Sequence, residues 1–72
     1  MMQLNLRHVR RSLNVTQDAL SKKSGVSRAT ISYLESGAAT DTTVGTLTKL
    51  ADALGIEVSA LFLPHESSVL DN

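Results

Sequence analysis

Residues 16–37 read TQDALSKKSGVSRATISYLESG and predict two short helices joined by a sharp glycine turn. Leu20 supplies the apolar contact of the first helix, and Ile31 and Leu34 supply the inner face of the second. Gly25 lies between the helices, where its freedom to adopt a left-handed backbone ends the first helix at low cost. The pattern therefore predicts a compact pair of helices that share one apolar side.

Hydroxyl side chains mark the beginnings of the predicted helices. Thr16, Ser27 and Thr43 each precede such a segment, and their hydroxyl oxygens can accept a hydrogen bond from a free amide of the first turn. Gly37 and Gly55 are suitable terminators for the helices that Ser27 and Thr43 begin. These three helices are expected over about residues 16–24, 27–36 and 43–54.

Two further helices are predicted nearer the ends of the chain. The spacing of apolar residues predicts a first helix over residues 3–13, which Asn14 ends. Residues 57–62 predict a short fifth helix, and Pro64 stops it from continuing far. No segment alternates in the manner of a strand. The expectation is an all-α, compact five-helix domain over residues 1–63, followed by a short tail over residues 64–72.

The composition argues against several classes of protein. The 72 residues form one small domain at most, with a core that is marginal unless a second subunit covers apolar surface. The chain has no cysteine and two isolated histidines, His8 and His65, so we expect no disulfide, no metal centre and no cofactor. No apolar stretch approaches the roughly 18 residues of a membrane span, and the N-terminus lacks the apolar block of a signal peptide. We therefore expect a cytoplasmic protein without a membrane partner.

The net charge of zero conceals a division between the two halves of the chain. Residues 1–36 hold six basic and two acidic side chains, a formal charge of +4. Residues 37–72 hold one basic and five acidic side chains, a formal charge of −4. Such asymmetry favours a basic binding face and an acidic reverse face, although it can also arise by chance.

Three segments carry a family likeness: LRHVRRSLNVTQDAL at 6–20, GVSRATISYLESG at 25–37 and TLTKLADALGIEVSALF at 46–62. On these segments the chain resembles the lambda-repressor-like family of phage repressors, Cro proteins and Xre-type bacterial regulators. The match fixes several signals in order, which makes it more specific than a bare helix-turn-helix pattern. The resemblance implies a DNA-binding domain whose third helix enters the major groove.

The outward face of the third helix is the expected site of base contacts. Arg28 is the strongest candidate, because a guanidinium group can donate twice to guanine; the alternatives are a phosphate contact and a solvated side chain. Ala29 can contact a thymine methyl or serve only as a helix former. Tyr33 can reach a base or a phosphate, or pack its ring half-buried. The implied base contacts are Arg28, Ala29, Ser32 and Tyr33.

A second set of residues is implied as contacts to the phosphate backbone. Gln17 lies at the start of the second helix, where free amides and the helix dipole favour a phosphate. Thr16 and Ser27 are explained equally well as helix caps alone. The implied phosphate contacts are Thr16, Gln17, Ser27, Thr30, Ser36 and Arg10. Other basic residues, namely Arg7, Arg11, Lys22 and Lys23, are expected mainly as solvated side chains.

Arg10 is also expected to form an ion pair with Glu35, because the resemblance places the first helix against the end of the third. Such a pair adds little net stability when partly buried, yet removal of one partner leaves an uncompensated charge. Two departures from the family pattern stand out. Residues 38–41 read Ala-Ala-Thr-Asp where the family usually has basic residues, which predicts weaker and less salt-dependent DNA binding. Ser24 stands where an aliphatic residue is common and is expected to loosen the local core.

A second copy of the chain is the expected partner on DNA. One domain of this size reads only a few base pairs, so useful specificity needs two copies on two half-sites. Leu61 and Phe62 can instead close the core of the monomer, whereas the apolar residues after them are harder to bury within one chain. The candidate dimer interface comprises Val58, Leu61, Phe62, Leu63, Val69 and Leu70.

The sequence therefore predicts a dimeric, sequence-specific transcriptional regulator. We expect a repressor that occludes a promoter by binding a pseudo-palindromic operator in double-stranded DNA. The alternative is a protein-interaction module on the same fold, such as an antitoxin or an adaptor with a regulatory protein partner, which the acidic second half favours. An enzyme is not expected, because the chain offers no paired base and nucleophile.

Overall fold

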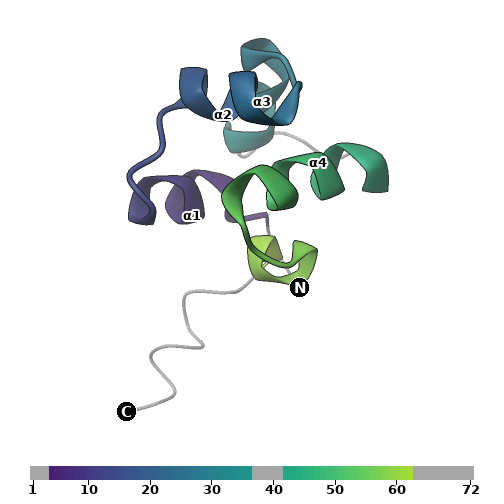
Figure 1. Ribbon diagram of the computed structural model, residues 1–72. Helices are drawn as coiled ribbons and strands as arrows, with labels where there is room; N and C mark the ends of the chain where they lie inside the picture. The colour runs from purple at the N-terminus through teal and green to yellow at the C-terminus, as the bar shows by residue number, and fades with distance from the viewer. Residues whose placement is uncertain (1–3, 37–41, 63–72) are drawn as a thin grey trace.

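The computed structural model describes residues 4–36 and 42–62, in which every regular element is a helix and no strand occurs. The all-α prediction is therefore confirmed. The fifth helix is a 3-10 helix, a geometry typical of such short runs. In chain order the elements are α1 (Leu6–Ser12), α2 (Gln17–Ser24), α3 (Arg28–Glu35), α4 (Val44–Leu54) and η1 (Val58–Phe62) (Figure 1).

Three helices begin at the predicted hydroxyl caps. The side chain of Thr16 accepts a hydrogen bond from the amide of Ala19, at 3.0 Å. The side chains of Ser27 and Thr43 accept in the same way from the amides three residues further on. Each cap satisfies one of the amides that a helix leaves without a partner at its N-terminus. Short-range chemistry thus places the starts of α2, α3 and α4.

The first helix is shorter than predicted. It begins at Leu6 because Asn5 has non-helical backbone angles, and the amide of Asn5 donates to the carbonyl oxygen of Leu61 at 2.6 Å. This long-range bond joins the start of α1 to η1 and ends the helical pattern there. Asn14 follows the end of α1 in the left-handed conformation, with φ of 60°, in agreement with its predicted role as a terminator.

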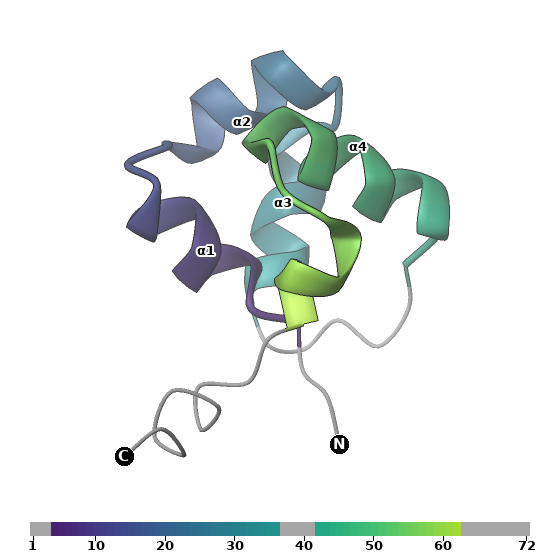
Figure 2. The same cartoon turned by 60° about the horizontal axis from the view of Figure 1, so that its bottom comes forward.

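One apolar core lies among all five elements. Leu6, Leu20, Ile31, Leu50 and Leu61 are its fully buried large side chains, so every element contributes one. The helix α2 contacts α3 and α4, whereas η1 contacts both α1 and α4. Figures 1 and 2 show η1 beneath the space between α1 and α4. This packing fixes α3 by its inner face and leaves its other face outside the core.

The turn between α2 and α3 depends on Gly25, whose φ of 77° lies in the left-handed region. We expect Gly25→Ala to lower the free energy of unfolding by about 1–2 kcal/mol, because a Cβ atom strains this conformation even though space is open around it. Gly45→Ala is the matched control. Gly45 has no left-handed φ and an added Cβ would meet only ordinary contacts, so alanine there should stabilise by roughly 0.4–1 kcal/mol.

Urea unfolding of the two variants measures this difference directly. Equal changes of the same sign in both variants would contradict a specific conformational role for Gly25.

Candidate nucleic-acid interface

The helix α3 has one face in the core and one face outside it. Ile31 and Leu34 are 0% and 3% exposed, and they anchor the helix from its inner side. The four residues predicted as base contacts, namely Arg28, Ala29, Ser32 and Tyr33, are all exposed on the described structure. Tyr33 retains 45% of its surface, so its ring is not packed away in the core. The structure therefore brings the predicted residues together on one accessible helix face.

Several hydroxyl groups that were predicted as phosphate contacts already have partners within the chain. Thr16 and Ser27 act as caps, and the Ser27 hydroxyl also donates to Oγ1 of Thr30 at 2.9 Å. The Ser36 hydroxyl donates to the carbonyl oxygen of Tyr33 at 2.7 Å. The cap explanation of Thr16 and Ser27 is thus realised, and a contact with phosphate remains a prediction for Thr16, Ser27, Thr30 and Ser36.

A buried ion pair connects α1 to the last turn of α3. Arg10 Nε lies 2.6 Å from Oε2 of Glu35, and Nη2 lies 3.0 Å from Oε1. The third nitrogen, Nη1, donates to the carbonyl oxygen of Val15 at 2.7 Å. The side chains of Arg10 and Glu35 are only 10% and 4% exposed. This is the pair expected from the sequence, in the two-pronged geometry that guanidinium and carboxylate groups favour.

Gln17 joins this ion pair from the start of α2. Its Nε2 donates to Oε1 of Glu35 at 3.0 Å, so the carboxylate receives bonds from two helices. Sequence reasoning missed this role, because the bond requires the start of α2 to meet the end of α3 in space. The one signal in the sequence was a polar side chain at the first residue of α2.

The environment of Glu35 lowers the pKa of its carboxyl group. Burial acts to raise this pKa, but hydrogen bonds from Arg10 and Gln17 and the positive charges of Arg10 and Arg7 together outweigh it. The same hydrogen bond raises the pKa of Arg10 against the opposing effect of burial. Both groups therefore remain charged at neutral pH, and the three helix ends are joined by a charged network.

The network changes the expectation for two predicted phosphate contacts. Arg10 is 8% exposed, and each of its guanidinium nitrogens donates within the chain. The guanidinium group of Arg10 is therefore held within the chain, and a phosphate contact by Arg10 remains a prediction. The side-chain amide of Gln17 is directed to Glu35, so a phosphate there would have to meet the backbone amides at the start of α2.

Ser24 has a role that the sequence did not indicate. Its hydroxyl oxygen accepts a hydrogen bond from the amide of Val26 at 3.1 Å. Val26 is buried behind the turn, and its amide is satisfied by this bond. The serine thus replaces an apolar contact with a hydrogen bond that holds the turn between α2 and α3.

The candidate dimer interface divides into three groups. Leu61 is fully buried in the core of the monomer, so its assignment to a dimer interface was wrong. Val58 and Phe62 are half-buried and pack against the core while retaining exposed surface. Leu63, Val69 and Leu70 lie outside the described residues, as do residues 38–41 and the tail over residues 64–72.

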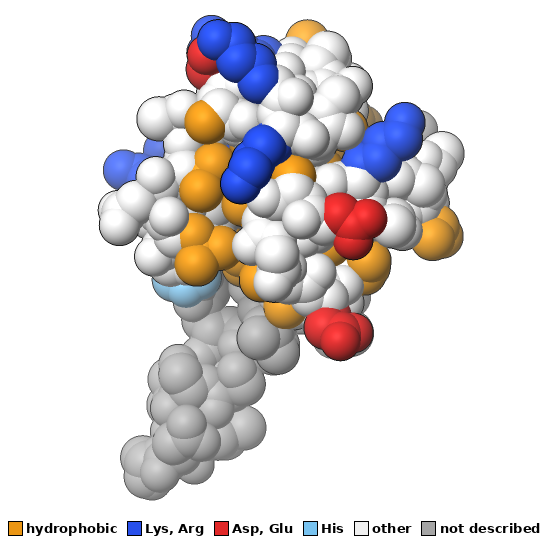
Figure 3. All heavy atoms as spheres, viewed as in Figure 1, with side chains coloured by type: hydrophobic (Ala, Val, Ile, Leu, Met, Phe, Trp, Pro, Cys, Tyr) orange, Lys and Arg blue, Asp and Glu red, His pale blue; other side chains and the backbone are white. Residues whose placement is uncertain are grey.

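The surface adds two observations. On the face seen in Figure 3, apolar side chains gather between α1 and the side that carries α4 and η1, and basic side chains lie above and beside them. Among the described helices none is long and apolar enough to cross a membrane. Within residues 4–36 and 42–62, no group of three or more potential ligand side chains could hold a metal ion.

Two solved structures have a fold similar to that of this chain. The hypothetical transcription factor NHTF from Neisseria is 25% identical, with a TM-score of 0.78 over 94% of this chain and 77% of that one. A chain from the complex of the SinR and SinI proteins is 22% identical, with a TM-score of 0.72 over 92% of this chain and 70% of that one. The second likeness shows the fold alone. No protein of curated function matches the sequence.

A family model described as helix-turn-helix matches residues 6–61, which begin at α1 and end within η1. This range includes both helices of the motif and every fully buried large side chain of the core. The match therefore covers the whole described core as well as the helix-turn-helix motif. The chain belongs to the lambda-repressor-like, Xre-type helix-turn-helix family, whose members are DNA-binding regulators rather than enzymes.

Proposed function

We propose that this protein is a dimeric, sequence-specific repressor that inserts α3 into the major groove of a pseudo-palindromic operator. The observation that carries the proposal is the exposed face of α3, where Arg28, Ala29, Ser32 and Tyr33 stand opposite the buried Ile31 and Leu34. A helix held firmly by its inner side can present such a face to base edges without rearrangement.

The four exposed side chains differ in what they can recognise. Arg28 lies at the first residue of α3, where its guanidinium group can donate to both major-groove acceptors of one guanine. The methyl group of Ala29 suits contact with a thymine methyl group. Ser32 and Tyr33 lie about one turn further along and can hydrogen-bond to bases or to the backbone. Arg28 is therefore expected to contribute most of the sequence selectivity.

We expect Arg28→Ala to weaken binding to the preferred operator by about 1–3 kcal/mol and to abolish the preference at one base position. Arg28→Lys is the matched control, because lysine keeps the charge but lacks the planar fork of the guanidinium group. The lysine variant should retain the affinity for mixed-sequence DNA, and its preference at that base position should fall between those of the wild type and of Arg28→Ala. Sequences selected by each variant from a random DNA pool measure this difference, and unchanged selectivity in both would contradict the proposed groove contact.

Dimerisation is proposed because one copy of α3 reads too little DNA for useful specificity. Val58 and Phe62 on η1 support this part of the proposal, since both are apolar and pack against the core while only half-buried. A symmetric dimer that binds two half-sites needs its two α3 helices about one turn of DNA apart. The spacing of half-sites in the selected sequences tests this arrangement.

The overall proposal is tested by electrophoretic mobility shifts of the purified chain on the selected duplexes over a range of salt concentrations. A shifted complex with two chains per duplex is the expected result. The acidic second half of the chain favours a second candidate, in which the fold mainly binds a regulatory protein. Failure to shift any duplex at low salt would reject the first proposal in favour of the second.

A further inference from the structure

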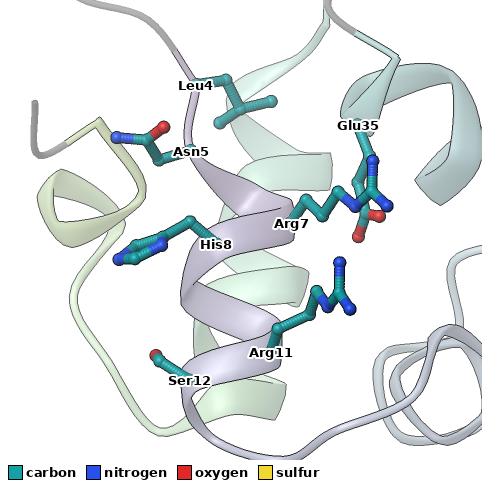
Figure 4. A pocket seen from close by; sticks show the side chains of 7 residues that line it. All are labelled: Leu4, Asn5, Arg7, His8, Arg11, Ser12 and Glu35. Carbon is teal, nitrogen blue, oxygen red and sulfur yellow. The ribbon is translucent and has the colours of Figure 1, made fainter. Parts of the chain in front are cut away.

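An open hollow lies between α1 and the end of α3, and it is lined by residues of both helices (Figure 4). Arg7 and Arg11 stand four residues apart on α1, about one turn of the helix. Figure 4 shows both guanidinium groups extending from α1 on the side where Glu35 lies. Both arginines are exposed, so a ligand in solution can reach them.

The hollow carries more positive charge than its carboxylate can balance. Glu35 already accepts two hydrogen bonds from Arg10 and one from Gln17. In the part of the chain that the structure describes, neither Arg7 nor Arg11 has an ion-pair partner within 4.0 Å. Arg10 already balances the charge of Glu35, so Arg7 and Arg11, which line the hollow, leave a formal surplus of two positive charges.

The hollow also lies beside one end of the recognition helix. In a helix-turn-helix complex the N-terminal residues of the recognition helix contact the base edges. If Arg28, the first residue of α3, contacts bases in this way, the last turn of α3 lies away from those bases and nearer the sugar-phosphate backbone at the edge of the groove. Arg28 is the first residue of α3 and Glu35 is its last, and Arg7 and Arg11 line the hollow together with Glu35.

We infer that Arg7 and Arg11 bind the DNA phosphate backbone at the edge of the groove that α3 enters. This inference rests on the proposed function, because it requires α3 to occupy the groove. Two positive charges suit two successive phosphates, each of which carries one negative charge. The contact would supply ionic interactions that residues 38–41, Ala-Ala-Thr-Asp, do not offer.

The test compares two double variants of the full chain that lose equal charge. Arg7→Gln with Arg11→Gln removes the proposed contact, and Lys23→Gln with Lys49→Gln removes two positive charges beside a different hollow, between α2 and α4. The measurement is the slope of log K against log salt for a mixed-sequence duplex. We expect the arginine variant to reduce this slope by about 1.8, because each lost phosphate contact removes about 0.9.

The expected change is large enough to measure. When the salt concentration rises fourfold, the wild-type chain should lose about tenfold more affinity than the arginine variant. The lysine variant should keep the wild-type slope, and both variants should keep the wild-type base preference. Arg7→Lys with Arg11→Lys should also keep the slope, and its circular dichroism and that of the glutamine variant should match the wild type.

Three other results would each reject the inference. If wild-type DNA binding and its dependence on Arg28 are present but the arginine variant keeps the full slope, the inference fails and the proposed function stands. If the arginine and lysine variants reduce the slope equally, the effect is one of net charge and the contact is absent. If only binding to poly-L-glutamate depends on Arg7 and Arg11, the hollow takes an acidic protein segment instead of DNA.

Discussion

Replacing Arg10 with alanine is expected to lower the free energy of unfolding by about 3–5 kcal/mol. The substitution removes both bonds from Arg10 to Glu35 and leaves a buried carboxylate that keeps a hydrogen bond from Gln17. A small domain has only about 5–15 kcal/mol of stability in total. A loss of this size should therefore bring the Arg10→Ala variant close to its unfolding transition at 37 °C. Urea unfolding at neutral pH, followed by circular dichroism, measures the loss.

The same substitution should reverse the pH dependence that Glu35 contributes. In the wild type the pKa of Glu35 is lowered from its ordinary value of about 4.5, so its contribution to stability is present above that pH and is lost as the pH falls through the lowered pKa. Without Arg10 the main lowering influence is gone, and burial raises the pKa of Glu35 instead. The variant should then gain stability relative to the wild type as the pH falls from 7 toward 4.5.

A variant with both charges removed distinguishes a stranded charge from lost packing. Arg10→Met with Glu35→Leu keeps apolar volume and leaves no uncompensated charge, so it should recover much of the loss. Recovery should be incomplete, because the carbonyl oxygen of Val15 loses its bond from Arg10 and the side-chain amide of Gln17 loses its bond to Glu35. The double variant could instead be as unstable as Arg10→Ala, and the stability of Arg10→Ala could fail to approach that of the wild type at low pH. Both results together would show that the ion pair contributes through packing and not through its charges.

The sequence predicted features that depend on interactions between near neighbours in the chain, and it failed where residues far apart in the sequence interact. Thr16 and Ser27 were assigned as caps correctly because a cap bonds within three residues of itself. Gly25 was assigned correctly because a left-handed turn residue ends a helix locally. The start of α1 was placed too early because a bond from Asn5 to Leu61, far away in the sequence, ends the helical pattern.

The candidate interface shows the same limit. The outward face of α3 follows from helical periodicity alone, so Arg28 and its neighbours could be predicted as exposed. The bond from Gln17 to Glu35 could not, because it requires the starts and ends of different helices to meet. Leu61 and Phe62 are adjacent apolar residues of η1, and only the packing of η1 against α1 and α4 determines which of them enters the core.

Leu61→Ala is expected to lower the free energy of unfolding by about 2–5 kcal/mol, because it leaves a cavity at a fully buried position. The loss should be independent of protein concentration, since Leu61 packs within one chain. Phe62→Ala is the matched control, because Phe62 is half-buried and belongs to the proposed dimer patch. The Phe62→Ala substitution should reduce the free energy of dimerisation by more than it reduces the free energy of unfolding of the monomer.

Unfolding at several protein concentrations, combined with sedimentation analysis, separates these two effects. A Leu61→Ala monomer as stable as the wild type but unable to self-associate would return Leu61 to the dimer interface. The structure argues for the opposite result, because η1 contacts both α1 and α4, and the carbonyl of Leu61 accepts the amide of Asn5. A cavity there would loosen α1, which carries Arg10, and with it the ion pair that holds the end of α3. DNA binding by the Leu61→Ala variant should therefore fall in step with the stability of the monomer and not with the fraction of dimer.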